Sequence, residues 1–262
     1  VFGLANSAIY FIGVNVGRDH MAYVVTDLQN NIIKEYLDTS FELVDRPQCL
    51  ERICQNIEKF VAECGVDREK ILGVGVSIVG RVNPETGRSY KYFTSCEESL
   101  RDIISKRIEI RVMLENDTRA RCYAEYTTGK SKNESNVLYL HMGRGVAIGI
   151  VIDGKLYYGK NGFAGEFGHI PFFNNEIICG CGKKGCLETY ASATGVARTA
   201  YEWLEKTDEP SVLRNLDKIA SKDVYEAAKA GDKLALRIFD FTGDILGRTF
   251  ADFIAFSSPE AI

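Results

Sequence analysis

The sequence lacks three features, and each absence excludes a class of protein. It has no basic surplus, because 32 Lys and Arg residues stand against 36 Asp and Glu residues. Phosphate contacts dominate nucleic-acid affinity and need clustered cations, so this chain is not expected to grip nucleic acid by itself. It has no apolar run near the ~20 residues that a membrane-spanning helix requires, and its first residues do not form a signal peptide. We therefore expect a cytoplasmic protein without membrane contact.

The cysteines also lack the arrangement of a secreted disulfide framework. Such frameworks are short and densely bridged, whereas this chain has 262 residues and eight cysteines. We expect five of them to be reduced thiols in the cytoplasm: Cys49, Cys54, Cys64, Cys96 and Cys122. The other three, Cys179, Cys181 and Cys186, fall within eight residues of one another and require a separate explanation.

The length and the composition indicate an ordinary globular protein. A chain of 262 residues with 45% hydrophobic and 26% charged residues forms one large domain or two modest ones. It does not begin with Met, and it ends at Ile262 where a new apolar strand starts. We expect it to be an internal piece of a longer protein, truncated at both ends.

Hydrophobic periodicity predicts an α/β fold with strands and helices in alternation. The predicted strands are Tyr10–Val16, Met21–Thr26, Ile32–Asp38, Ile71–Val79, Ile110–Leu114, Val137–His141, Val146–Ile152 and Lys155–Tyr158. The predicted helices are Pro47–Cys64, Ser99–Ile108, Thr118–Tyr126, Ala193–Lys206, Asp223–Ala230 and Lys233–Phe256. Two similar halves each open with a Gly-bearing hairpin, which suggests a duplicated two-lobe fold with a cleft between the lobes. We place an N-terminal lobe at residues 1–117 and a C-terminal lobe, which carries the cysteine cluster, at residues 118–262.

The cysteine cluster predicts a metal site. The run from Cys179 through Cys181 to Cys186 contains three glycines, which allow the backbone to wrap around a small ion. Zinc takes four ligands, usually thiolate and imidazole, and His169 lies ten residues before Cys179. A Cys₃His set leaves no open coordination position, so we expect a structural zinc ion that stabilises these loops.

Carboxylates flank this predicted zinc site and suit the hydroxyls of a sugar. Glu166 lies three residues before His169, and Glu188 lies two residues after Cys186. Zinc would fix both carboxylates in one small volume, as acceptors for adjacent hydroxyl groups. Elsewhere, Asn116 and Asp117 follow a buried strand, where side chains emerge into a cleft. Asp117 could act as a general base, although Glu-Asn-Asp at a strand end also serves as a helix cap.

These motifs resemble the signature of the ROK family, whose name joins repressors, uncharacterised reading frames and sugar kinases. The similarity rests on Glu115–Asp117, Gly165–His169 and Cys179–Glu188 and extends in order through essentially the whole chain. It implies an α/β, actin-like ATPase (ribonuclease H-like) fold with a sugar between two lobes. It also implies zinc held by His169, Cys179, Cys181 and Cys186, sugar held by Asn116, Asp117, Glu166, His169 and Glu188, and Asp117 as the catalytic base in the kinases.

The phosphate loops depart from the pattern of the family's kinases. The first loop typically reads Asp-x-Gly-Gly-Thr, and the matching positions here are Asn15, Val16, Gly17, Arg18 and Asp19. The Asp19 carboxylate would face a phosphate, and two like charges ~4 Å apart repel by about 4 kcal/mol at an effective dielectric of ~20. The second loop prefers Gly-Thr-Gly, and it reads Gly143, Arg144 and Gly145 here. Arg144 either clamps a phosphate or, as we prefer, fills a disused phosphate site and pairs with Asp19.

An intact sugar set with eroded phosphate loops resembles the family's sugar-responsive repressors, such as those for N-acetylglucosamine or xylose. Residues 1–10, before the first strand, resemble a linker from an N-terminal helix-turn-helix domain that would bind DNA and is not in this chain. We therefore expect a sugar-binding regulator domain, assembled as a homodimer or homotetramer. The alternative is a sugar kinase for hexoses or N-acetylhexosamines, which would require ATP and Mg²⁺.

Overall fold

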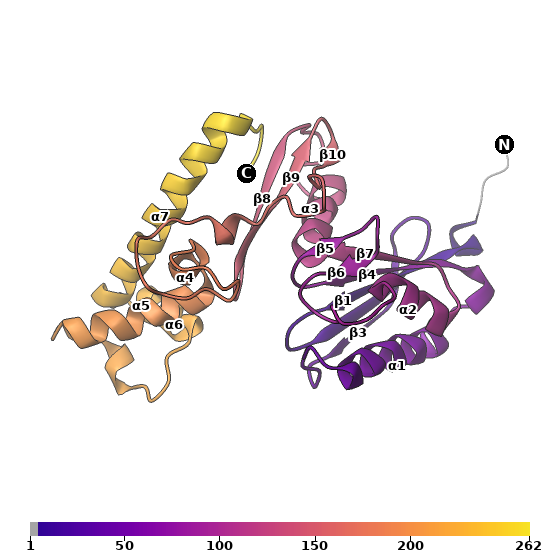
Figure 1. Ribbon diagram of the computed structural model, residues 1–262, viewed down its shortest axis with the longest axis horizontal. Helices are drawn as coiled ribbons and strands as arrows, with labels where there is room; N and C mark the ends of the chain where they lie inside the picture. The colour runs from indigo at the N-terminus through magenta and orange to yellow at the C-terminus, as the bar shows by residue number, and fades with distance from the viewer. Residues whose placement is uncertain (1–4) are drawn as a thin grey trace. The chain divides into compact units, whose positions relative to one another are not determined.

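The structure, a computed structural model, describes residues 5–262, which form two compact units (Figure 1). The first unit contains the described residues up to Ala124 together with the segment Tyr158–Ala164. The second unit contains Glu125–Tyr157 and Gly165–Ile262. The chain therefore passes from one unit to the other three times. Residues 1–4, at the start of the predicted lead-in, lie outside the described residues.

A five-stranded sheet in the order β3-β2-β1-β4-β7 forms the centre of the first unit. The elements of this part of the chain are η1 (Asn6–Ala8), β1 (Tyr10–Val16), β2 (Met21–Thr26), β3 (Ile32–Asp38), α1 (Pro47–Glu63), η2 (Arg68–Lys70), β4 (Ile71–Ile78), β5 (Val82–Asn83), β6 (Arg88–Ser89), α2 (Leu100–Ile108), β7 (Val112–Asn116) and α3 (Asp117–Thr128). Strands β1, β2 and β3 form an antiparallel meander, and β4 and β7 run parallel to β1. The carboxyl ends of the parallel strands β1, β4 and β7 therefore meet at one edge of the sheet.

Period-two and period-3.6 patterns explain which face of this sheet is buried. Ile12, Val14 and Val16 alternate along β1 and are each at most 3% exposed. Helices α1 and α2 pack against this face, and α1 contributes a buried stripe that includes Ile53 and Ile57 (Figure 1). The stripe recurs every three or four residues, as the sequence predicts for an amphipathic helix.

The second unit combines a small antiparallel sheet, in the order β10-β9-β8, with a group of helices (Figure 1). Its elements after α3 are β8 (Val137–Met142), β9 (Val146–Ile152), β10 (Lys155–Leu156), η3 (Phe167–His169), α4 (Glu188–Ala191), α5 (Ala193–Lys206), η4 (Val212–Asn215), α6 (Ser221–Lys229) and α7 (Lys233–Ser257). Asp153 and Gly154 both have positive φ and join β9 to β10, as the hairpin signal predicts. The unit contains a helical core around Leu234 and a second core around Phe167 and Leu187.

The structure corrects the ends of several predicted elements, and helix α3, for example, covers Asp117–Thr128 rather than Thr118–Tyr126. Strand β7 covers Val112–Asn116 rather than Ile110–Leu114, because Glu109 takes a left-handed conformation and the chain is still turning out of α2 before Val112. Strand β10 ends at Leu156 rather than at Tyr158, because the chain after Tyr157 joins the first unit. Helix α6 begins at Ser221, before Asp223, because the Asp223 carboxylate accepts a hydrogen bond from the N–H of Ala220 and caps the helix from inside.

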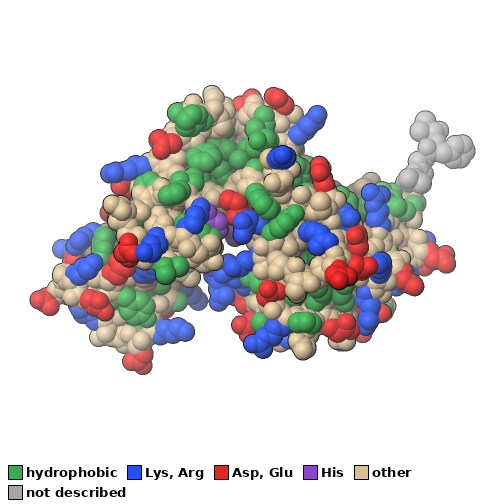
Figure 2. Space-filling model, viewed as in Figure 1, with side chains coloured by type: hydrophobic (Ala, Val, Ile, Leu, Met, Phe, Trp, Pro, Cys, Tyr) green, Lys and Arg blue, Asp and Glu red, His purple; other side chains and the backbone are tan. Residues whose placement is uncertain are grey.

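None of the helices in residues 5–262 combines the length and the hydropathy needed to cross a membrane. On the face drawn in Figure 2, acidic and basic side chains are interspersed, in keeping with the net charge of −4.

Candidate functional site

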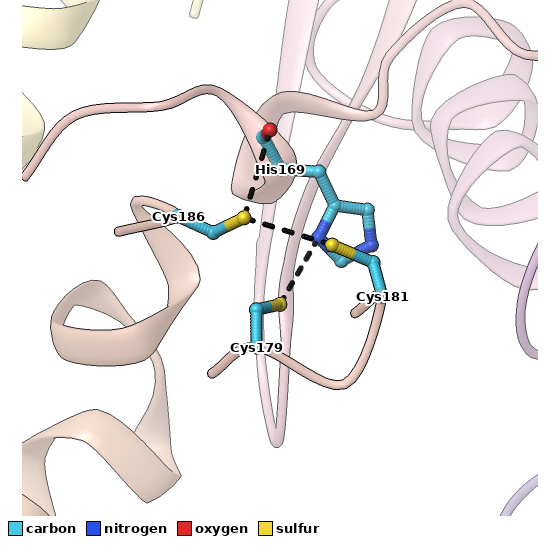
Figure 3. A group of neighbouring side chains, drawn as sticks. All are labelled: His169, Cys179, Cys181 and Cys186. Carbon is cyan, nitrogen blue, oxygen red and sulfur yellow. Dashed lines mark hydrogen bonds between the residues drawn. The ribbon is translucent and has the colours of Figure 1, made fainter. Parts of the chain in front are cut away.

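The three clustered cysteines and His169 lie together in the second unit (Figure 3). His169 ends η3, Cys179 and Cys181 lie on the loop that follows, and Cys186 lies just before α4. The three Sγ atoms and a ring nitrogen of His169 all lie within 4.8 Å of one another. Sulfur atoms and imidazole point toward a common centre, so these four residues form a possible Cys/His metal site.

Two of the separations between these atoms match those of tetrahedral coordination. Two thiolates at ~2.3 Å from a tetrahedral zinc ion lie about 3.8 Å apart, and a thiolate and an imidazole nitrogen lie about 3.5 Å apart. Cys181 Sγ lies 3.6 Å from Cys186 Sγ, and Cys179 Sγ lies 3.5 Å from His169 Nδ1. The donor set therefore fits the ion that the sequence predicts.

The thiols of the cluster have unequal proton affinities. Burial raises the pKa of Cys179 and that of Cys186. Burial acts in the same direction on Cys181, but the backbone N–H of Lys183 and the two neighbouring thiols lower the pKa of Cys181 below its ordinary value. A cation that binds here must displace protons from buried thiols, so its affinity should increase with pH.

The two ring nitrogens of His169 face different partners. Nδ1 faces Cys179, and it lies 3.9 Å from Glu188 Oε1. Nε2 lies 3.7 Å from Glu166 Oε2. Metal-bound histidines commonly donate their second N–H to a carboxylate, and Glu166 lies on that side of the ring, at a distance longer than a hydrogen bond. The predicted carboxylates Glu166 and Glu188 thus both lie beside the imidazole.

Asn116 and Asp117 lie together in the first unit, where β7 ends and α3 begins. Asn116 Nδ2 donates to Gly80 O at 2.9 Å and to Asp117 Oδ1 at 3.0 Å, and Asn116 Oδ1 accepts from the N–H of Arg119 at 3.0 Å. Asn116 therefore caps α3, which realises the alternative considered from the sequence. The same side chain also orients the Asp117 carboxylate, so capping and positioning of Asp117 are one arrangement.

Arg119 organises this part of the first unit, and no motif in the sequence marks it. Its side chain is 3% exposed, and Nε donates to Glu115 Oε1 at 2.7 Å. Its other two nitrogens donate to the carbonyls of Gly162 at 2.7 Å and Val82 at 2.8 Å, and the guanidinium lies over the ring of Tyr158. Arg119 thereby holds the segment Tyr158–Ala164 against the end of β7.

The hydroxyl of Tyr158, which is half-buried, also responds to this arrangement. Burial, together with the negative charge of Glu115 and a hydrogen bond to it, raises the pKa of Tyr158 to about 12. The only sequence signal for this arrangement is an arginine two residues after Asp117. Arginine is also common on exposed helix faces, so the signal does not show that this residue is buried. The contacts of Arg119 join residues about forty positions apart, which no local pattern encodes.

The first glycine turn, between β1 and β2, is closed by its own side chains. A Cβ added to Gly17 would lie 2.6 Å from the ring of His20, so the imidazole lies directly against the turn. His20 Nδ1 lies 2.9 Å from Asp19 Oδ1, and Nε2 lies 3.3 Å from Asn15 Nδ2. A neutral ring with its proton on Nδ1 satisfies both contacts. Asn15 Oδ1 in turn accepts a hydrogen bond from Ser77 Oγ at 2.9 Å.

The second glycine turn, between β8 and β9, belongs to the second unit. The N–H of Gly143 donates to Gly145 O at 2.9 Å, and the N–H of Val146 donates to Glu188 Oε2 at 3.2 Å. Arg144 lies in the second unit and Asp19 in the first, and the predicted pairing of the two stays a prediction. Likewise, the structure brings together Asn116 and Asp117 in one unit, and Glu166, His169 and Glu188 in the other.

The sequence of this chain matches one known family and is similar to those of kinases and repressors. The sequence model described as "ROK family" matches residues 11–262. A glucokinase of Halalkalibacterium halodurans is 31% identical over 92% of this chain, and the match covers 78% of the glucokinase. A xylose repressor of Bacillus spizizenii is 28% identical over 97% of this chain, and the match covers 63% of the repressor.

Two solved structures also resemble this chain. A ROK family transcriptional regulator, described as a homologue of the E. coli MLC protein, has a TM-score of 0.85 and 28% identity, and the match covers 97% of this chain and 64% of the regulator. A ROK family glucokinase from Streptomyces griseus, in complex with glucose and AMPPNP, has a TM-score of 0.78 and 28% identity, and the match covers 95% of this chain and 80% of the glucokinase. The predicted α/β, actin-like ATPase fold class is confirmed.

Proposed function

This chain belongs to the ROK family, and from that premise we propose that it is the sugar-binding part of a transcriptional regulator of carbohydrate metabolism. The observation that carries the proposal is the contrast between the predicted sugar-binding residues and the first glycine turn. Every residue of the predicted sugar set is present, whereas the first glycine turn is covered by His20.

In this proposal the sugar is bound by Asn116 and Asp117 of the first unit and by Glu166, His169 and Glu188 of the second. Carboxylates accept hydrogen bonds from sugar hydroxyls, and such charge-assisted bonds are roughly twice as strong as neutral ones. Asp117 acts here as an acceptor rather than as a base in turnover, and Asn116 holds it in place through the bond to Oδ1.

We propose zinc as the ion of the Cys/His cluster. His169 Nδ1 and the Sγ atoms of Cys179, Cys181 and Cys186 fill all four positions of a tetrahedral ion, which is typical of a structural rather than a catalytic site. The ion would lock the imidazole so that Nε2 faces Glu166. Its contribution is to orient sugar-binding groups.

The first glycine turn argues against phosphoryl transfer. A phosphate-binding turn presents backbone N–H groups to the anion, but the N–H of Gly17 donates to His20 O at 3.0 Å. The imidazole of His20 lies against this glycine, and Asp19 adds a negative charge beside it. An incoming nucleotide would have to displace the ring and approach a like charge.

A sugar kinase is the second candidate. It is favoured by the 31% identity to a glucokinase, against 28% for the xylose repressor, and by the solved glucokinase with glucose and AMPPNP. In that case Asp117 takes the proton from the attacking hydroxyl, and ATP with Mg²⁺ supplies the phosphoryl group.

Contact with DNA through a helix-turn-helix segment outside these residues, assembly as a homodimer or homotetramer, and a cytoplasmic location complete the regulator proposal. Sugar binding would favour one arrangement of the protein over another by differential affinity. The described residues supply the sugar-responsive part of such a switch.

Calorimetric titration of the zinc-loaded chain tests the proposal. With glucose, xylose, N-acetylglucosamine and N-acetylmannosamine as the panel, we expect at least one to bind. Asp117→Ala and Glu188→Ala should each weaken that binding roughly ten- to hundredfold, as loss of hydrogen bonds to a charged group predicts. Glu205→Ala, on an exposed face of α5, is the matched control and should leave the affinity unchanged.

ATP decides between the two candidates. For a regulator, ATP with Mg²⁺ leaves sugar affinity unchanged, and a coupled assay detects no sugar-dependent ADP release. Sugar-dependent ADP release that disappears in Asp117→Ala would establish the kinase instead. Absence of binding to every sugar of the panel would contradict both candidates for these ligands.

A further inference from the structure

The second glycine turn is fixed to the start of α5. Gly143 O accepts a hydrogen bond from the N–H of Ala193 at 2.9 Å, and Arg144 O accepts one from Thr194 Oγ1 at 3.0 Å. Two consecutive carbonyls of the turn are therefore bound to a helix of the same unit. These two bonds restrain the turn against the start of α5.

The group that lies against it is the carboxylate of Glu188. Glu188 is the first residue of α4, and its Oε2 accepts the hydrogen bond from the N–H of Val146. A Cβ added to Gly145 would lie 2.4 Å from this same oxygen, a distance at which something must move. The carboxylate thus occupies the space that any side chain at position 145 would fill.

Space, and not backbone conformation, accounts for the glycine at position 145. Ten glycines of the described residues have positive φ, and Gly145 is not among them. Alanine could therefore adopt its backbone conformation, and the atoms that the added Cβ would meet are the end of the Glu188 side chain alone. Gly168 differs, because a Cβ there would lie 2.2 Å from the backbone oxygen of Val146 and disturb the fold.

We propose that Gly145 and the N–H of Val146 position the Glu188 carboxylate for sugar binding. The inference rests on the proposed function and deepens it. A turn that matches a phosphate loop by sequence here holds a sugar-binding carboxylate in position. Gly145 is thus a positioning residue, which acts through Glu188 and does not itself touch the sugar.

The test begins with Gly145→Ala in the zinc-loaded chain. The variant should keep its zinc content and its melting temperature, because only a flexible side-chain end has to move. Its affinity for the sugar that the wild type binds should fall roughly tenfold or more, as expected when a charged hydrogen-bond acceptor is displaced. Gly243→Ala is the control, since nothing lies within 4 Å of a Cβ added there.

A compensating variant separates positioning from a general structural effect. Glu188→Asp shortens the side chain, so it should relieve the collision in Gly145→Ala while it weakens binding in the wild type. The cost of Glu188→Asp should therefore be smaller in the Gly145→Ala background. Strictly additive costs, or an unchanged affinity in Gly145→Ala, overturn the inference.

A readout without sugar keeps this inference distinct from the proposed function. Hydrogen exchange of the Val146 amide, followed by NMR, should be slow in the wild type and at least severalfold faster in Gly145→Ala and in Glu188→Ala. If no sugar of the panel binds, the proposed function fails for those ligands, and the Val146 amide still decides whether Gly145 seats Glu188. Equal exchange rates in all three proteins would contradict the inference that Gly145 and the N–H of Val146 position Glu188.

Discussion

The two units hold their candidate residues in different ways. In the first unit, Asn116 ends a parallel strand and Asp117 begins the next helix, and Asn116 hydrogen-bonds to Asp117, with Arg119 buried beside them. In the second unit, His169 lies on a three-residue 3₁₀ helix and Glu188 begins a four-residue helix. These short elements converge on a cluster of thiols and imidazole rather than on a sheet.

The difference teaches where each of these two groups of residues obtains its order. A strand end in a five-stranded sheet is fixed by the packing of the whole unit. Elements of three and four residues have little helical stability of their own, so a metal ion that binds them together would provide most of their stability. We therefore expect the first unit to be indifferent to a metal chelator and the second to be sensitive to it.

Loss of the ion should have the largest effect. Cys186→Ala, or chelation at neutral pH, should remove stabilisation on the order of 10 kcal/mol from the loops of the second unit. Amide exchange should then accelerate in Gly165–Ala191 and remain slow in β1, β4 and β7, and metal analysis should find about one zinc ion in the untreated chain only. Cys96→Ser, in the first unit, is the control. Equal acceleration in both units would break the comparison.

Removal of Arg119 should have the next largest effect, and it should lower the stability of the first unit. Arg119→Met leaves Glu115 and two carbonyls without their partner, which costs about 3 kcal/mol for a buried ion pair that is broken on one side. Circular dichroism during urea unfolding should show the loss, whereas fluorescence should not, because the single tryptophan, Trp203, packs in the helical core of the second unit.

The control for this variant is Arg121→Met, two residues further along α3 and exposed. Its effect should stay within about 0.5 kcal/mol, as is usual for surface substitutions. A shift of the Trp203 transition in Arg119→Met would mean that the two units unfold together, and the contrast between them would then lose its basis.

The smallest effect should come from the cap of α7. Asp232 accepts hydrogen bonds from the N–H groups of Ala235 and Val212, so Asp232→Ala should cost about 1 kcal/mol. Chelation should not change this cost, because the helical core lacks the metal ligands. Asp240→Ala, exposed on the same helix, is the control. A cost that grows after chelation would show that the metal orders the helical core as well.

The same cap predicts a pH dependence. Burial opposes ionisation of Asp232, but the backbone N–H groups and Ser211 outweigh it and lower its pKa below the ordinary value. A lowered pKa in the folded state stabilises the protein fully above the pKa of the unfolded state, and this stabilisation is lost as pH falls through the folded pKa. The difference in Trp203 unfolding between wild type and Asp232→Ala should therefore shrink in acid, and a constant difference would contradict the cap.

Sequence reasoning succeeded where the signal is local. Runs of β-forming residues between turns predict β1, β2 and β3 with their observed bounds, and the spacing of Cys179, Cys181 and Cys186 predicts a cluster that the fold assembles with His169. It missed Arg119, whose partners come from distant parts of the chain. It also extended β10 to Tyr158, because a strand-like pattern does not reveal that Tyr158 packs against Arg119 instead of continuing the hairpin.

The threefold passage of the chain between the units has a practical consequence. Neither unit is one continuous stretch of sequence, since Tyr158–Ala164 belongs to the first unit although it is encoded within the second. A gene fragment that stops at Ala124 would produce a first unit in which the buried guanidinium of Arg119 lacks the carbonyl of Gly162 as its acceptor. To express the first unit separately, those seven residues have to be joined to it, for example through a linker after Ala124.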